Sequence, residues 1–106
     1  MAYEVLWTSH ARADVDSAVK YIATALDSPK ASAEHLDAFL DAVDRLADSP
    51  ELYAVSQQTS LATRELRCCP VKRYVMLYSF DDGCVVVHRV FSMLQDYVKL
   101  IERRGV

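Results

Sequence analysis

Four cationic side chains that could bind an anion stand in the second half of the sequence. They are Arg67, Lys72, Arg73 and Arg89. Residues 61–106 carry eight Lys or Arg against five Asp or Glu, a formal charge of +3, whereas residues 1–60 carry four against ten, a formal charge of −6. Lys and Arg bind carboxylates and phosphates through charge-assisted hydrogen bonds. The sequence therefore predicts that an anionic partner would meet the C-terminal half of this −3 chain.

The cysteines and histidines do not have a spacing typical of a metal site. Cys68 and Cys69 are adjacent, so on a strand their side chains would point to opposite faces. A zinc site made of Cys68, Cys84 and His88 would lack a CxxC-type pair. We interpret the three cysteines as small apolar residues, and we expect no metal and no cofactor. An odd cysteine count, without a basic and apolar leader at the start, favours a cytoplasmic protein.

The length and composition predict one globular domain over residues 1–106. Apolar residues make up 52% of the chain and charged residues 25%, which is typical of a folded protein rather than a disordered one. A chain of this size buries roughly 65% of the surface of its unfolded state, enough for one core. No run approaches the length of about 18 apolar residues that a membrane-spanning helix needs.

The first half of the sequence predicts a strand followed by two helices. Residues 3–7, "YEVLW", alternate and are rich in strand-forming residues. Thr8 or Ser9 can cap a helix in which apolar residues recur every three or four positions. A second helix begins after Ser28, because Pro29 suits its first turn. The short turn between the two helices favours an antiparallel helical hairpin.

The second half predicts three strands. Residues 63–69 alternate in polarity until Pro70 ends the run, and residues 73–80 and 84–91 form two further strand-like segments. Between the last two lies Asp82-Gly83, a pair favoured in type I′ turns because both central positions have positive φ.

The register of this hairpin depends on the length of its loop. If Asp82 and Gly83 form the loop, Tyr78 faces Val87 and Met76 faces Arg89. A loop of three residues, 81–83, would shift the pairing by one position.

A short C-terminal helix completes the expected order of elements. Its apolar residues are Leu94, Tyr97, Val98 and Ile101, with the helical pattern starting at Leu94. The order is β-α-α-β-β-β-α. It predicts an α+β fold in which an antiparallel-dominated sheet of about four strands is packed mainly on one face by the helical hairpin.

This order of elements, together with two segments of the sequence, resembles the RelE/ParE superfamily of toxins from type II toxin–antitoxin modules. The first segment is "YEVLWTSHARADVDSAVKYI", a strand followed by a helix that begins with an Ala and, three positions later, an Asp (the pattern "A..D"). The second is "RELRCCPVKRYVMLYSFDDGCVVVHRVFSMLQDYVKLI". Its family-like positions are Arg67, Tyr74, Tyr78, Asp81, Asp82, Arg89, Val90, Asp96 and Tyr97. The resemblance implies a toxin that a cognate antitoxin neutralises.

The resemblance implies one of two activities, and this sequence departs from the pattern of the first. RelE-like members cut messenger RNA on the ribosome without a metal, whereas ParE-like members inhibit DNA gyrase. Metal-free cleavage needs a base, an acid and cations that stabilise the phosphorane. Here Val75 stands where RelE-like nucleases have Arg, and Ser92 and Met93 stand where relatives often have His or Arg. Ser92 is a neutral hydroxyl with no evident base beside it.

These departures favour a toxin that acts by binding, with gyrase as its target. The alternative from the enzyme class is a ribosome-dependent endoribonuclease in which Arg67, Arg73 and Arg89 hold the phosphate and Tyr97 donates the proton. A third hypothesis is an inactive toxin-fold module that retains only antitoxin binding. The catalytic candidates, if the chain is a nuclease, are Arg67, Arg89 and Tyr97. The binding candidates are Arg67, Lys72, Arg73, Arg89, Ser92, Asp96 and Tyr97.

The same residues also have simpler structural interpretations. Arg67 and Arg89 can pair with a nearby carboxylate, and Tyr97 can be a core aromatic residue whose hydroxyl reaches water. His88, which lies among valines, is typical of a half-buried strand residue.

All three hypotheses predict a small antitoxin partner. Such a partner would fold on binding, bury on the order of 1,000–3,000 Å² and cover the sheet face and the junction near Ser92. An acidic segment of it would reach Arg67, Lys72, Arg73 or Arg89. The assembly is expected to be a homodimer or a toxin–antitoxin hetero-oligomer.

Overall fold

A computed structural model describes residues 2–57, 59–62 and 64–104 of the chain. Helices and strands follow the expected order, with one additional short helix and a 3₁₀ turn in the connection after the hairpin. The elements are β1 (Glu4–Trp7), α1 (Ser9–Ala25), α2 (Pro29–Asp48), η1 (Pro50–Leu52), α3 (Thr59–Ala62), β2 (Arg67–Val71), β3 (Tyr74–Asp81), β4 (Cys84–Ser92) and α4 (Tyr97–Arg104). No helix within these described ranges is long and apolar enough to cross a membrane.

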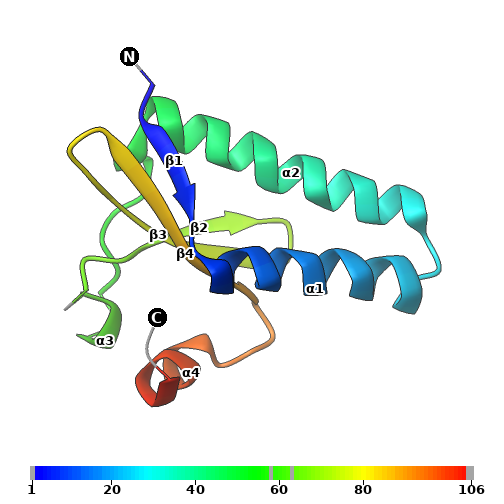
Figure 1. Cartoon of the computed structure of the whole chain (residues 1–106). Coiled ribbons are helices and arrows are strands. Elements are labelled where there is room, and N and C mark those ends of the chain that lie inside the picture. Colours follow the sequence, from blue (N-terminus) through cyan, green and yellow to red (C-terminus); the bar gives the residue numbers. More distant parts are fainter. Residues whose placement is uncertain (1, 58, 63, 105–106) are drawn as a thin grey trace.

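The four strands form one sheet in the order β1-β4-β3-β2 (Figure 1). β2, β3 and β4 form an antiparallel meander, and β1 joins the edge of β4 in the parallel direction. The predicted α+β class with an antiparallel-dominated sheet is confirmed. The predicted caps are confirmed too, since the side chains of Thr8 and Ser28 accept hydrogen bonds from backbone N–H groups of the first turns of α1 and α2.

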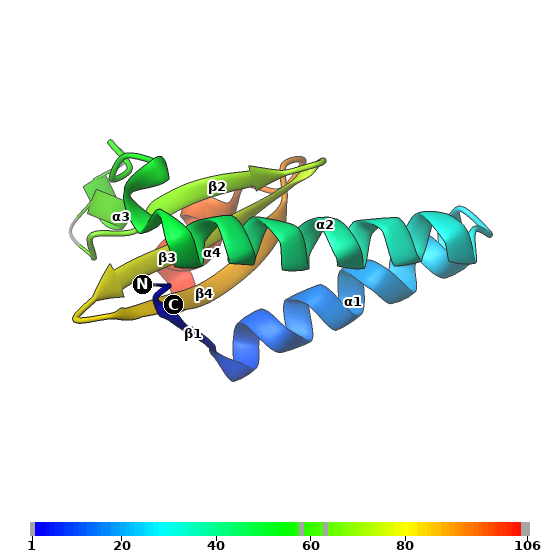
Figure 2. The same cartoon turned by 90° about the horizontal axis from the view of Figure 1, so that it is seen from above.

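Helices cover both faces of the sheet (Figures 1 and 2). The expectation that they lie mainly on one face holds for α1 and α2, whereas α3 and α4 lie on the other. Each face has its own core of buried side chains. The hairpin-face core includes Val15, Phe39, Leu46, Met76, Tyr78, Val85, Val87 and Val90. The α4-face core consists of Leu61, Leu66, Val75, Leu77, Phe91 and Ile101. Because both faces are covered, residues 75–78 of β3 are a continuous buried run.

The β3–β4 hairpin has the predicted turn, but only one of the two predicted residue pairs is correct. Asp82 and Gly83 form a two-residue loop with φ of 40° and 80°, and Tyr78 faces Val87 as expected. The predicted pairing of Met76 with Arg89 is wrong. A β-bulge at His88 inserts one extra residue into β4, so Arg89 faces Leu77 instead.

The predicted span of the second strand is also wrong. β2 begins at Arg67 because residues before it form a turn, in which Glu65 has a φ of 56° and its N–H donates to the carbonyl of Ala62 at 2.9 Å. Residue 63, the predicted start, lies outside the described residues. At the other end the strand continues through Pro70 to Val71. β2 is an edge strand, where a proline without an N–H is tolerated.

We predict that Tyr78→Phe will lower the free energy of unfolding by about 1–2 kcal/mol. Tyr78 is fully buried, and its hydroxyl donates to the carbonyl of Pro50 at 2.8 Å, which fixes η1 to the sheet. The substitution leaves that carbonyl without this donor. Urea unfolding measures the change, and Tyr21→Phe, on an exposed face of α1, serves as the control with little effect. Equal stability of both variants would show that the bond contributes nothing.

Candidate functional site

The carboxylate of Asp14 on α1 holds the C-terminal half of β4. It accepts hydrogen bonds from Arg89 Nε at 2.8 Å and from Arg89 Nη2 at 3.1 Å, which makes a bidentate ion pair. The same carboxylate accepts a third bond from the backbone N–H of Val90 at 2.9 Å. Both charged side chains are only 17% exposed. This geometry neutralises the Arg89 guanidinium within the protein.

Where β1 ends, side chains form hydrogen bonds with backbone groups of β4. β1 pairs with β4 only as far as Val87. Beyond that point the Thr8 hydroxyl donates to the carbonyl of His88 at 2.7 Å, Asp14 accepts from Val90, and the amide oxygen of Gln95 accepts from the N–H of Ser92 at 3.0 Å. Backbone groups that would otherwise be free to pair with another strand are therefore occupied.

The junction after β4 is a turn, and the prediction that the helix starts at Leu94 is wrong. The N–H of Gln95 donates to the carbonyl of Ser92 at 3.0 Å, and the Ser92 hydroxyl accepts from the N–H of Leu94 at 3.2 Å. Asp96 then caps α4, because its carboxylate accepts from the N–H of Lys99 at 3.3 Å. Leu94 is left 94% exposed in front of the helix.

A cleft of about 680 Å³ lies between α1 and this junction. It is lined by Arg89, Val90 and Phe91 of β4, by Tyr21 of α1 and by Leu94 of the junction. Among the described residues that line it, Asp14 and Arg89 are the only charged ones, and they form the ion pair above. The cleft therefore offers hydroxyl groups and apolar surface rather than net charge.

Arg67 lies away from this cleft, on the other face of the sheet. It pairs across strands with Tyr78 of the hairpin-face core, whereas Arg89 pairs with Leu77 of the α4-face core. Side chains of directly paired residues share one face of a sheet. The guanidinium of Arg67 donates to the carbonyl of Tyr53 and stacks on the ring of Phe80, 4.9 Å from its centroid. The sheet thus separates two of the predicted catalytic residues.

Lys72 and Arg73 form the β2–β3 turn, at the same end of the sheet as the cleft. Lys72 has a φ of 53°, and both side chains are exposed. The carbonyl of Arg73 accepts from the N–H of Met93 at 2.9 Å, and Ser92 pairs with Tyr74 next to it. Of the predicted binding residues, Arg73, Arg89 and Ser92 are therefore brought together near the cleft.

Tyr97 packs behind the cleft rather than inside it. Its ring stacks on Phe91, with centroids 6.1 Å apart, and belongs to the periphery of the α4-face core. Burial raises the pKa of the Tyr97 hydroxyl, and so does the nearby thiol of Cys68. The guanidinium of Arg89 also lies over the ring of Phe91, 4.6 Å from the ring centroid. A tyrosine in this position is a packing residue with a weakly acidic hydroxyl.

The described residues contain no group of three or more His, Cys, Asp or Glu that could hold a metal ion. The thiols of Cys68 and Cys69 have pKa values raised by burial, which disfavours the thiolate that binds metals or attacks substrates. The residue that organises the cleft, Asp14, was not among the candidates from the sequence. The signal for it was the "A..D" entry of the first helix, Ala11 to Asp14.

The comparisons with known proteins agree with this architecture. A family model described as the ParE toxin of the type II toxin–antitoxin system parDE matches residues 5–97. The chain belongs to the ParE toxin family. The predicted superfamily and the type II toxin component are thereby confirmed.

A solved structure shows the same fold as this ParE-family chain. It is described as the chromosomal ParDE TA system from P. aeruginosa, and the matched chain has a TM-score of 0.68 and 15% sequence identity. The match covers 86% of this chain and 96% of that chain. No curated protein matches in a sequence search. The ParE family match ends at Tyr97, so most of α4 lies outside it.

We predict that Asp14→Ala will destabilise this ParE-family protein by about 3 kcal/mol, because it leaves a mostly buried guanidinium and a strand N–H without their acceptor. Chemical denaturation measures the change. Asp16→Ala is the matched control, since Asp16 is an exposed carboxylate on the same helix and its loss should be nearly neutral. A small effect at Asp14 would show that water replaces the carboxylate at little cost.

We predict that His88 makes the protein less stable in mild acid. Its ring nitrogen lies 2.8 Å from the Ser79 hydroxyl, and burial lowers the pKa of the imidazole below its ordinary value of 6.5. Above pH 6.5 the group is neutral in both states. Below that pH the unfolded chain binds the proton first, so the free energy of unfolding falls as the pH falls, with a slope of at most about 1.4 kcal/mol per pH unit.

The His88 contribution is measured by comparing unfolding at pH 7 and pH 5 for the wild type and His88→Asn. The amide can keep the bond to Ser79 but does not titrate, so the variant should lose less stability between the two pH values. Equal losses in both proteins would contradict the assignment.

Proposed function

We propose that this toxin acts by binding a protein target, DNA gyrase, and not by cleaving RNA. The observation that supports this most strongly is the state of Arg89. Its guanidinium is held by the carboxylate of Asp14 and is not available as a free cation. A dianionic phosphorane beside this pair would meet a net charge of zero and the carboxylate itself, and electrostatic stabilisation of that intermediate is usually the largest catalytic effect.

The placement of the other candidates gives further support. Arg67 lies on the opposite face of the sheet, and Tyr97 is stacked behind Phe91 with a raised pKa. Arg67 thus lies on the wrong side of the sheet for a phosphate placed at Arg73 and Ser92, and the raised pKa makes the Tyr97 hydroxyl a weaker acid. A general acid and a general base are each worth roughly 10² to 10⁴ in rate, so a site without them would be a poor ribonuclease.

We further propose that the toxin acts in the cytoplasm and forms a hetero-oligomer with a cognate antitoxin. Membership of the ParE toxin family of the parDE system supports the antitoxin partner. Three free cysteines among the described residues, of which Cys69 is buried, are compatible with a reducing compartment.

The test measures two activities of the same purified toxin. We expect it to inhibit supercoiling by gyrase and to leave messenger RNA on stalled ribosomes intact. Cleavage of the ribosome-bound message at specific positions would overturn the proposal. So would the absence of any effect on gyrase, which would instead favour an inactive module.

One double variant separates the two mechanisms in cells. Arg73→Ala with Tyr97→Phe removes an exposed cation near the cleft and the only proposed proton donor, yet leaves the Asp14–Arg89 pair in place. Growth arrest on induction should persist in this variant if the toxin binds its target without RNA chemistry. Loss of arrest by a folded variant, as judged by circular dichroism, would favour the endoribonuclease.

A further inference from the structure

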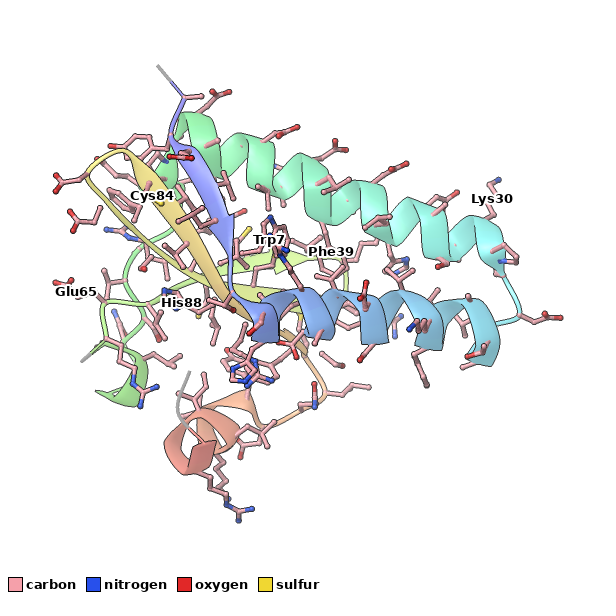
Figure 3. All side chains as sticks on the ribbon, in the orientation of Figure 1. Trp7, Lys30, Phe39, Glu65, Cys84 and His88 are labelled. Carbon is pink, nitrogen blue, oxygen red and sulfur yellow. The ribbon has the colours of Figure 1, made fainter. Side chains whose placement is uncertain are left out.

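The groove between α1 and α2, here named the hairpin groove, exposes large apolar side chains. It has a volume of about 320 Å³ and is lined by the apolar residues Trp7, Val15, Leu36, Phe39 and Leu40 and by the charged residues Arg12 and Asp16. Figure 3 shows Trp7 and Phe39 in the angle between the two helices. Leu36 is 38% exposed and Leu40 is 49% exposed. An exposed apolar patch with a polar rim is typical of a surface that binds another protein.

The charged rim of the hairpin groove consists of one cation and one anion of the same helix. Arg12 and Asp16 are both exposed, and they lie four positions apart on α1, so they share one face of the helix. None of the ion pairs formed within the described residues includes either side chain. The rim therefore has a net charge of zero, with a guanidinium and a carboxylate that are not paired. A partner that offers the same two charges in the opposite order would satisfy both.

The exposed apolar residues of the groove have the same spacing on α2. Leu36 and Leu40 also lie four positions apart, and they line the same groove as Arg12 and Asp16. The two helices run side by side in opposite directions (Figures 1 and 2). The midpoint of the charged pair and the midpoint of the leucine pair therefore lie at a similar level of the hairpin.

This arrangement is complementary to a second copy of itself. A two-fold axis that crosses both helices at these midpoints, near residues 14 and 38, places a second hairpin over the first with each helix antiparallel to its copy. Position 12 of one subunit then faces position 16 of the other, and position 36 faces position 40. In a two-fold interface each of these contacts occurs twice, because the same surface is used by both subunits.

We propose that the hairpin groove is the interface of a homodimer in which two α1–α2 hairpins pack as an antiparallel four-helix bundle. Arg12 would pair with Asp16 of the partner subunit, and Asp16 with Arg12 of the partner subunit. The exposed leucines would be buried against Leu36 and Leu40 of the partner subunit. The proposal depends neither on gyrase as the target nor on the antitoxin.

The proposed interface uses none of the residues that line the cleft at the end of β4. Asp14, Ser17 and Tyr21 are residues of α1 that line the cleft, whereas Arg12 and Asp16 line the hairpin groove. A dimer would therefore present two copies of the cleft. A partner with two binding segments would gain affinity from such a pair, because its second segment binds at a high effective concentration.

An anionic partner fits the hairpin groove poorly. The exposed carboxylates of Asp37 and Asp41 lie next to the leucines in the sequence, and Asp16 adds a third negative charge against the one cation. Tight binding of a nucleic acid usually rests on several phosphate contacts with Lys or Arg. A wholly basic segment would leave Arg12 without a partner. In the dimer the Asp37 carboxylates would lie at the edge of the interface, where water and salt screen their repulsion.

The first experiment measures the dimer dissociation constant of the purified full chain by sedimentation equilibrium. We expect a monomer–dimer equilibrium that Leu40→Ser weakens roughly tenfold, as is typical of a central apolar contact. Leu94→Ser is the matched control, because it makes the same change at a leucine that is 94% exposed and lines the other cleft. A wild type that stays monomeric would overturn the proposal. So would a dimer that Leu94→Ser weakens and Leu40→Ser does not.

The second experiment exchanges the two charges of the rim. Arg12→Asp should weaken the dimer more than roughly tenfold, because it places two carboxylates opposite each other at both ends of the interface. Adding Asp16→Arg to the same chain should restore the dimer, since the charges are again opposite across the two-fold axis. Lys99→Glu, at an exposed cation of α4, is the control without effect.

Recovery in the double variant is the decisive result. A partner of another kind would not carry the compensating change, so only pairing with a second copy predicts it. A double variant that is folded by circular dichroism and remains monomeric would overturn the proposal. At concentrations where the monomer predominates, Asp16 is solvated, and Asp16→Ala has little effect on unfolding.

Discussion

The structure depends most on the carboxylate of Asp14, which joins the helical hairpin to the sheet where regular strand pairing stops. Two guanidinium N–H groups of Arg89 and the N–H of Val90 all converge on it. A mostly buried carboxylate needs this number of partners, because an uncompensated charge away from water is strongly unfavourable. The pair therefore fixes the angle of α1 against β4 and, with it, the shape of the cleft between them.

Local contacts occupy backbone groups of β4 beyond the end of β1 and part of the edge of β2. On one side, β1 pairs with β4 and side chains continue where β1 ends. On the other side, Pro70 removes an N–H from β2 and an isolated bridge joins Val55 to Arg67. Natural sheets use such devices to prevent unwanted strand addition.

The β-bulge at His88 determines which face of the sheet Arg89 lies on. It shifts the alternation of β4, so Val85, Val87 and Val90 all face the helical hairpin although their spacing is not regular. Arg89 is turned toward the α4 face, against Phe91 and within reach of Asp14. Arg67 lies on the hairpin face. Two cations from the same half of the sequence, Arg67 and Arg89, thus become separate structural contacts on opposite faces of the sheet.

The sequence by itself determined the order of elements, the two helix caps, the Asp82-Gly83 turn and membership of the toxin superfamily. These features depend on short-range chemistry, such as a hydroxyl beside the first turn of a helix or positive φ in a two-residue loop, which a few neighbouring residues are sufficient to fix. Only the tertiary structure decided the start of β2, the delayed start of α4, the register beyond the bulge and the pairing of Arg89 with Asp14. The register and the ion pair require contacts between residues distant in the chain, 75 positions apart for the ion pair. The turn that delays α4 is likewise tied to the β2–β3 turn, because the N–H of Met93 donates to the carbonyl of Arg73. Whether an arginine is a free cation or a structural one depends on its partner in space, and its neighbours in the sequence do not specify that partner.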